Sequence, residues 1–334
     1  MAQNWRRRVK LICELRPWNI NEPLRHSAAK PQLKPQNQMN HRDTKSTEKA
    51  RKQRLTTDYG RSTDGYKKRS RNDPDGNMNR PTTDYLSQCR RIIDVVAGQS
   101  SGIQKAAGWF AKTILAGRMV HLFGSGHSRI LVEEMWPRYG SFPGFNPIVE
   151  LSLTFHNLVV GANGQRQAMF LENVSGLAPR ILRNFNIKKA DSALVISSSG
   201  CSIVPIEMAE QFQKMGVRVV AIHSRAHAEA TSSKRKDGKK LEDFADMVLD
   251  TGAPVGDAMV RVPGLDTPVA PGSTLGGVML INCIKAELAA KLASAGKPPS
   301  VLSSSAIVGK KRSRDLFEAA YDEHAERLAK LFTR

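Results

Sequence analysis

Residues 119–128, with the sequence MVHLFGSGHS, constrain the fold most, because they predict a buried strand, a tight turn and a helix start in succession. Residues 119–123 are mostly apolar, and Gly124 and Gly126 let the backbone approach a ligand closely. Ser128 is suited to cap a helix over residues 129–139. A helix N-terminus presents unpaired N–H groups and a positive dipole, so this turn, with Ser125, is a candidate anion-binding loop. An ordinary tight turn has the same pattern, so one copy leaves both interpretations open.

A second unit later in the chain repeats this order of parts. An apolar run over residues 193–196 is followed by a hydroxyl-rich loop and then by a predicted helix over residues 203–215. Serine hydroxyls donate hydrogen bonds to phosphate oxygens without adding charge, and a glycine among them permits the turn. The loop residues concerned are Ser197, Ser199, Gly200 and Ser202.

A third candidate loop precedes the long apolar helical run at residues 275–292, and it contains Ser273 and Thr274. Three helix starts at one edge of a sheet would form an uncharged cradle for a phosphate ester. Asp257, which follows the last predicted strand, is a candidate either for this site or for a helix cap.

The alternation of strands and helices predicts an α/β fold, a doubly wound five-stranded parallel sheet. The predicted strands are residues 119–123, 147–151, 193–196, 217–222 and 247–250. Ligands of such sheets bind beyond the carboxyl ends of the strands, which is where the first two loops lie.

The remaining segments complete the expected domain. Helices are predicted over residues 84–96, 103–116 and 174–186, and an amphipathic C-terminal helix over residues 315–332. Residues 152–172, with His156 and a loop at 161–164, are expected to be irregular.

Residues 1–80 form a basic tail ahead of a single domain over residues 81–334. The tail holds 20 lysines and arginines against 8 acidic residues and has little apolar periodicity, so it is expected to be disordered. Three origins stay open: a start codon assigned too far upstream, inert disorder, or a tail that contacts nucleic acid non-specifically.

The composition excludes several other classes of protein. The four cysteines (Cys13, Cys89, Cys201 and Cys283) are far apart, which favours reduced thiols, a cytoplasmic location and no metal site. We expect no membrane span, because no uninterrupted apolar run reaches about 18 residues. Neither a P-loop lysine nor a dinucleotide fingerprint is present, so no cofactor is expected.

These motifs together resemble the sugar isomerase (SIS) domain family, over residues 85–293 and closest to a branch of stand-alone bacterial proteins. The resemblance rests on G-S-G-H-S at 124–128, on the serine loop and S-T, and on N-P-I-V-E at 146–150, V-P-I-E-M-A at 204–209 and P-V-G-D-A at 254–258. It implies a flavodoxin-like fold that binds a phosphorylated sugar. It also implies phosphate contacts from Ser125, Ser128, Ser197, Ser199, Ser202, Ser273 and Thr274.

The reaction is less constrained, because the wider family includes isomerases, a lyase and non-catalytic sensors. The candidate acid–base groups are Glu134 on the helix after the first loop, Glu150 at the end of the second strand, and His127 inside the first loop. Family isomerases often carry a glutamate base near the start of the helix after the S-T loop, yet residues 275–284 contain no Glu or His. Acid–base transformation of a phosphosugar and non-catalytic sensing therefore both stay open.

The two helices ahead of the first strand predict an oligomer. Their apolar residues exceed what covering a five-stranded sheet requires, so part of this surface is expected to pack against another subunit. We expect a homodimer at least, in which a neighbour completes each site, as similar domains do.

Overall fold

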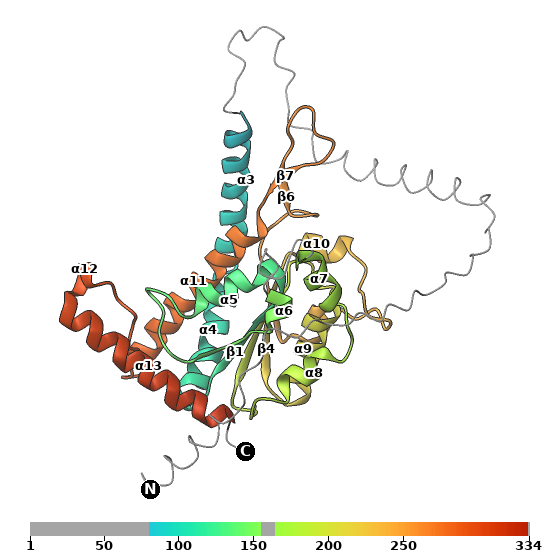
Figure 1. The fold of residues 1–334 in the computed structure, drawn as a ribbon. Coiled ribbons are helices and arrows are strands. Elements are labelled where there is room, and N and C mark those ends of the chain that lie inside the picture. Colours follow the sequence, from blue (N-terminus) through green and yellow to red (C-terminus); the bar gives the residue numbers. More distant parts are fainter. Residues whose placement is uncertain (1–79, 155–163, 333–334) are drawn as a thin grey trace, which may run out of the picture. The chain divides into compact units, whose positions relative to one another are not determined.

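The computed structural model describes residues 80–154 and 164–332. Its centre is a five-stranded parallel sheet in the order β2-β1-β3-β4-β5 (Figure 1). The strands are β1 (Val120–Gly124), β2 (Phe145–Ile148), β3 (Ser192–Ile196), β4 (Arg218–His223) and β5 (Met247–Asp250). The predicted doubly wound parallel sheet is confirmed.

Successive residues of the strands face two separate cores, as the two-residue period of a strand requires. On β3, Leu194 and Ile196 join one buried cluster, whereas Ala193 and Val195 join the other. Both faces are covered, so the strands are almost continuously apolar, which is typical of parallel sheets between helices.

One cluster packs against α4 (Ser100–Leu115), α5 (Arg129–Met135) and α11 (Ser273–Ser294), and the other against α8 (Leu177–Leu182) and α9 (Ile203–Lys214). Figure 1 shows the two sets of helices around the sheet. The close fit of α11 depends on Gly276, because a Cβ there would lie 1.9 Å from the Thr251 carbonyl oxygen. This fit brings the start of α11 to the loop that follows β5.

Other elements surround this layered centre. Helix α3 (Arg80–Ala97) contacts α11 and a hairpin of β6 (Ala258–Val260) and β7 (Val269–Pro271). The remaining elements are α6 (Leu151–Thr154), α7 (Gly164–Leu171), α10 (Arg225–Ala230), α12 (Ser305–Val308), α13 (Lys310–Phe332) and the short η1 (Gly126–Ser128) and η3 (Leu241–Phe244).

Several predicted boundaries were wrong. The helix expected over residues 129–139 ends at Met135, because Trp136 precedes Pro137 and adopts an extended backbone. The second strand is Phe145–Ile148, and Leu151 already begins α6. The described parts of residues 152–172 hold helical residues of α6 and α7 rather than an irregular chain.

Helix lengths also differ from the prediction. The helix expected over residues 174–186 is α8, Leu177–Leu182, whereas the first and last helices are longer than expected and begin at Arg80 and Lys310. The β6–β7 hairpin was not predicted, because strands of three residues give too short an apolar pattern.

Some expectations lie outside the described residues. They concern the tail, apart from Arg80, and His156 with the loop at 161–163. Within the described residues, no helix combines the length and apolarity that crossing a membrane requires.

A buried polar network holds the start of β1 against β3. The Asp191 carboxylate, which is inaccessible, accepts hydrogen bonds from Arg118 Nε at 2.8 Å and Nη2 at 2.7 Å. The Lys188 N–H donates to it as well, and His121 Nε2 lies 3.4 Å away. Burial by itself raises the pKa of Asp191, but the hydrogen bonds from His121 and Arg118 outweigh it and lower the pKa to about 2.

This network makes stability depend on pH at acidic values. The folded-state pKa lies below the ordinary 3.8, so the stabilisation is present above pH 4 and is lost as pH falls towards 2. We expect wild type to lose ~2 kcal/mol of unfolding free energy over this range through Asp191. Asp191→Asn should cost ~3 kcal/mol at pH 7, because Arg118 keeps a buried charge without its partner.

The measurement is urea denaturation at pH 7, 4 and 2.5. Asp315→Asn is the matched control, since Asp315 forms an exposed ion pair with Lys311 and such pairs contribute little to stability. An Asp191→Asn protein as stable as this control would contradict the account of the network.

Candidate functional site

The site is built where the chain order of the strands reverses, between β1 and β3. Gly124, the last residue of β1, is paired with Ile196, the last residue of β3. Ser125 and Ser197 therefore leave the sheet side by side. A crevice at such a switch point is the usual ligand site of doubly wound sheets.

A cavity of about 590 Å³ lies at this edge. Its walls come from the loops after β1 and β3, from α7, and from the segments on either side of the β6–β7 hairpin. All the residues predicted to contact phosphate line it: Ser125, Ser128, Ser197, Ser199, Ser202, Ser273 and Thr274. The structure thus brings together three loops that are far apart in the sequence.

The glycines of the first two loops have separate roles. At Gly124 a Cβ would lie 2.7 Å from the Ser128 carbonyl oxygen, so a side chain is excluded by the close turn. Gly126 and Gly200 have φ angles of 55° and 66°, in the region that disfavours other residues. Gly126 itself lines the cavity.

Two hydroxyls in the second loop accept hydrogen bonds from backbone N–H groups, so each can still donate its own proton to a ligand. Ser197 Oγ accepts a hydrogen bond from the Gly200 N–H, and Ser199 Oγ accepts one from the Cys201 N–H, both at 3.2 Å. A hydroxyl has one proton, and these contacts use only the oxygen lone pairs. Ser197 and Ser199 are therefore oriented as donors beside the start of α9.

Glu172, which the sequence analysis did not identify, joins the first loop to the second. Ser125 Oγ donates to Glu172 Oε2 at 2.8 Å, and Ser202 Oγ donates to Oε1 at 3.1 Å. Its backbone oxygen also accepts a hydrogen bond from the Val204 N–H in the first turn of α9. Glu172 lines the cavity, so a carboxylate stands between two of the predicted phosphate ligands.

Asp257 fills a similar role at the third loop. One carboxylate oxygen accepts the N–H groups of Gly272 and Ser273, and the other accepts the Ser273 hydroxyl at 2.8 Å. Asp257 has a φ of 72°, unusual for a residue other than glycine. It lines the cavity as well, so Asp257 both caps α11 and faces the site.

The candidate acid–base residues occupy different places. His127 is exposed and lines the cavity, whereas neither Glu134 nor Glu150 is among the residues that line it. Glu150 Oε1 instead accepts a hydrogen bond from the Ser152 hydroxyl at the start of α6.

Glu134 belongs to a polar cluster between α5 and α11. Its carboxylate accepts hydrogen bonds from Arg138 and Asn282, and Lys285 donates to its backbone oxygen at 2.7 Å. Burial by itself raises the pKa of Glu134, but the hydrogen bonds from Asn282 and Arg138 together lower it by more, so the net shift is downward. This environment keeps Glu134 ionised.

Two histidines beside the second loop were not among the predicted site residues. His227, on α10, lines the cavity, and its buried Nδ1 has no hydrogen-bond partner among the described residues. His223 is buried under Gly200, and burial lowers its pKa. No cluster of three or more potential metal ligands occurs in the part of the chain that the structure describes.

Comparisons with known proteins agree with this architecture. The SIS domain model matches residues 84–224. The chain is 32% identical to UPF0309 protein BH3325 of Halalkalibacterium halodurans over 228 residues, which cover 68% of this chain and 92% of that protein. It is 31% identical to UPF0309 protein BCAN_B0929 of Brucella canis over 241 residues, 72% of this chain and 95% of the relative.

Among solved structures, the chain is similar to phosphoheptose isomerase GmhA from Neisseria gonorrhoeae, with a TM-score of 0.40 and 14% identity over 64% of this chain and 98% of that one. The sequence relatives match nearly their whole length, and the SIS model spans the first four strands of the sheet. The chain therefore belongs to the UPF0309 family of SIS-domain proteins.

Proposed function

We propose that this protein binds a phosphorylated sugar in the cavity beside β1 and β3. The observation that carries the proposal is the orientation of Ser197 and Ser199, whose oxygens accept backbone N–H groups while their protons stay available. Both residues line the cavity directly ahead of α9, the twelve-residue helix that begins at Ile203. Hydroxyl donors beside the positive end of a helix suit a phosphate group.

The SIS domain and the polar lining of the cavity support the same ligand class. The polar groups around the phosphate position include hydroxyls, an amide and two carboxylates, a mixture that suits a polyhydroxylated ligand. Ser128 and Thr274, which also line the cavity, are further hydroxyl donors for the phosphate.

Replacing Ser199 by alanine removes one donor to a charged acceptor, a contact worth roughly 1.5–3 kcal/mol. The dissociation constant of a sugar 6-phosphate should therefore rise about 10- to 100-fold, whereas a change in affinity for the same sugar without phosphate is not expected. Isothermal titration calorimetry measures both.

Ser303→Ala is the control, because Ser303 is half-buried with a satisfied hydroxyl but does not line the cavity. If Ser199→Ala weakens the phosphorylated and unphosphorylated sugars equally, or neither, the phosphate does not bind at this loop.

We further propose that the bound sugar undergoes acid–base transformation, with His127 as the proton-transfer group. Of the three candidates for this role, His127 is the one that lines the cavity. Transfer of a proton between adjacent carbons of a sugar phosphate needs such a group, and an imidazole can both accept and donate a proton. Non-catalytic sensing is the alternative, and proton exchange separates the two.

His127→Gln should retain binding of a sugar 6-phosphate within about threefold, and it should lose most exchange of the carbon-bound proton with deuterated water, a 10²- to 10⁴-fold effect. Proton NMR measures this exchange. Wild-type protein that binds the sugar phosphates without any exchange would establish the sensing alternative instead.

We also propose a homodimer, with α3 at its interface. Most of the apolar surface of α3 and α4 that was expected to contact another subunit is buried within the subunit itself, because α4 packs against α11 and the sheet. Leu86 and Ile93 on α3 are each 49% exposed and lie seven residues apart, on one face of the helix. Val269 and Leu265 of the adjoining hairpin region are exposed too.

Ile93→Glu should shift the mass measured by light scattering at micromolar concentration from dimer to monomer, because it places a charge in an apolar contact. Ser87→Glu, also exposed on α3, is the control and should leave the dimer intact. A wild-type monomer at this concentration would contradict the proposal.

A further inference from the structure

The hydrogen bonds divide the polar groups of the cavity into two poles. At the donor pole, Ser197 and Ser199 offer protons. At the acceptor pole, Ser125 and Ser202 donate their hydroxyl hydrogen bonds to Glu172. Both hydroxyls can therefore only accept a hydrogen bond from a ligand. A phosphate, which only accepts, fits the first pole, and the group that meets the second pole must donate.

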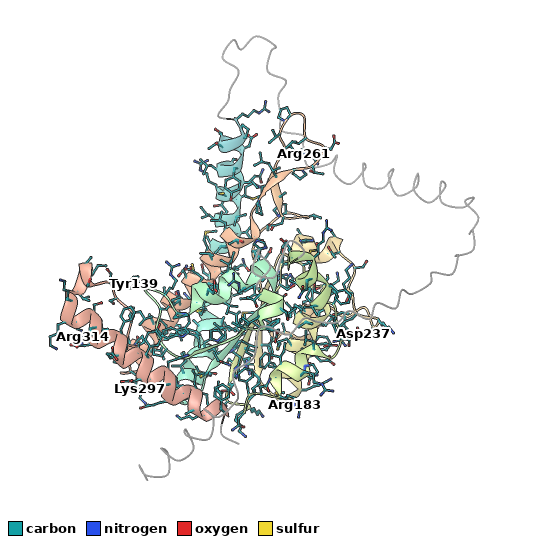
Figure 2. All side chains as sticks on the ribbon, viewed as in Figure 1. Tyr139, Arg183, Asp237, Arg261, Lys297 and Arg314 are labelled. Atoms are coloured by element: carbon teal, nitrogen blue, oxygen red, sulfur yellow. The ribbon has the colours of Figure 1, made fainter. Side chains whose placement is uncertain are left out.

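The lining of the cavity contains acidic residues but no lysine or arginine among the described residues. The acidic residues are Glu172 and Asp257. The lysines and arginines labelled in Figure 2 lie at the exposed periphery instead: Arg183, Arg261, Lys297 and Arg314. A phosphate dianion would therefore share the cavity with two carboxylates and without a lysine or arginine of the described residues.

Asp257 has less capacity left, because Oδ1 already accepts the N–H groups of Gly272 and Ser273, and only Oδ2, which accepts the Ser273 hydroxyl, keeps a lone pair. Each oxygen of Glu172 accepts a single serine proton and keeps a lone pair. The Glu172 carboxylate thus has the greater capacity for a ligand, with a lone pair on each of its two oxygens.

We infer that the ligand is an amino-sugar phosphate, with a protonated amine that binds at Glu172, Ser125 and Ser202. This inference rests on the proposed phosphosugar function and specifies its substrate class. An ammonium group has three N–H donors, which match one carboxylate and two hydroxyl oxygens, and its charge offsets that of Glu172. A sugar hydroxyl would donate one proton and leave the carboxylate charge unbalanced. An N-acetyl group would donate one proton and bring no charge.

The test compares ligands that differ only at this group. Isothermal titration calorimetry at neutral pH uses the 6-phosphates of glucose, glucosamine and N-acetylglucosamine, with the matching galactose and mannose series. In at least one series the free amine should bind about tenfold more tightly than both the hydroxyl and the N-acetyl form, because its hydrogen bond to the carboxylate is charge-assisted.

Glu172→Gln should reduce this preference to within about threefold while the hydroxyl sugar phosphate binds as well as before or better, since a carboxylate charge has been removed. Glu207→Gln is the matched control: Glu207 also accepts a serine hydroxyl, that of Ser175, but does not line the cavity. The wild-type comparison stands by itself if Glu172→Gln fails to fold.

The outcomes separate the two proposals. If no sugar 6-phosphate binds wild-type protein, the proposed function is wrong. If the phosphates bind and the amine confers no preference in any series, or if the preference survives in Glu172→Gln, the amine inference is overturned and the phosphosugar function stands. Ser199→Ala should weaken all three forms of a series by the same factor, because Ser199 belongs to the donor pole and not to the Glu172 group.

Discussion

The parallel pairing of β1 with β3 is the constraint on which the site depends. It places Gly124 beside Ile196 and so aligns two loops that are separated by about seventy residues of chain. The reversal of chain order at this pair leaves an open crevice at the carboxyl ends of the strands. The third loop reaches the same crevice because α11 packs closely against the end of β5 through Gly276.

The two carboxylates help to determine which hydroxyls of the cavity donate hydrogen bonds and which accept them. A serine hydroxyl can rotate and either donate or accept, but Glu172 takes the protons of Ser125 and Ser202, and Asp257 takes that of Ser273. Backbone N–H groups do the converse for Ser197 and Ser199. These five hydroxyls are therefore oriented before a ligand enters, which lowers the cost of ordering them on binding.

The sequence was sufficient to predict the sheet and the lining hydroxyls, because each strand, loop and helix start is a continuous segment. Glu172 could not be predicted in the same way. It follows α7, a helix of eight residues in a segment that was expected to be irregular, and its role comes from contacts with residues 47 positions before it and 30 after it. Glu134 shows the same limit: its helix was predicted, but the packing of α5 on α11 decides that its carboxylate meets Asn282. Periodicity finds elements, whereas such tertiary contacts depend on how the elements pack.

A crystal structure of the protein with its tightest-binding sugar phosphate tests the central claim most directly. Phosphate oxygens are expected about 3 Å from the hydroxyls of Ser197 and Ser199, with Glu172 still hydrogen-bonded to Ser125 and Ser202. A phosphate seated between Ser125 and Ser202 with Glu172 turned away, or one that replaces Asp257 at the start of α11, would contradict this claim.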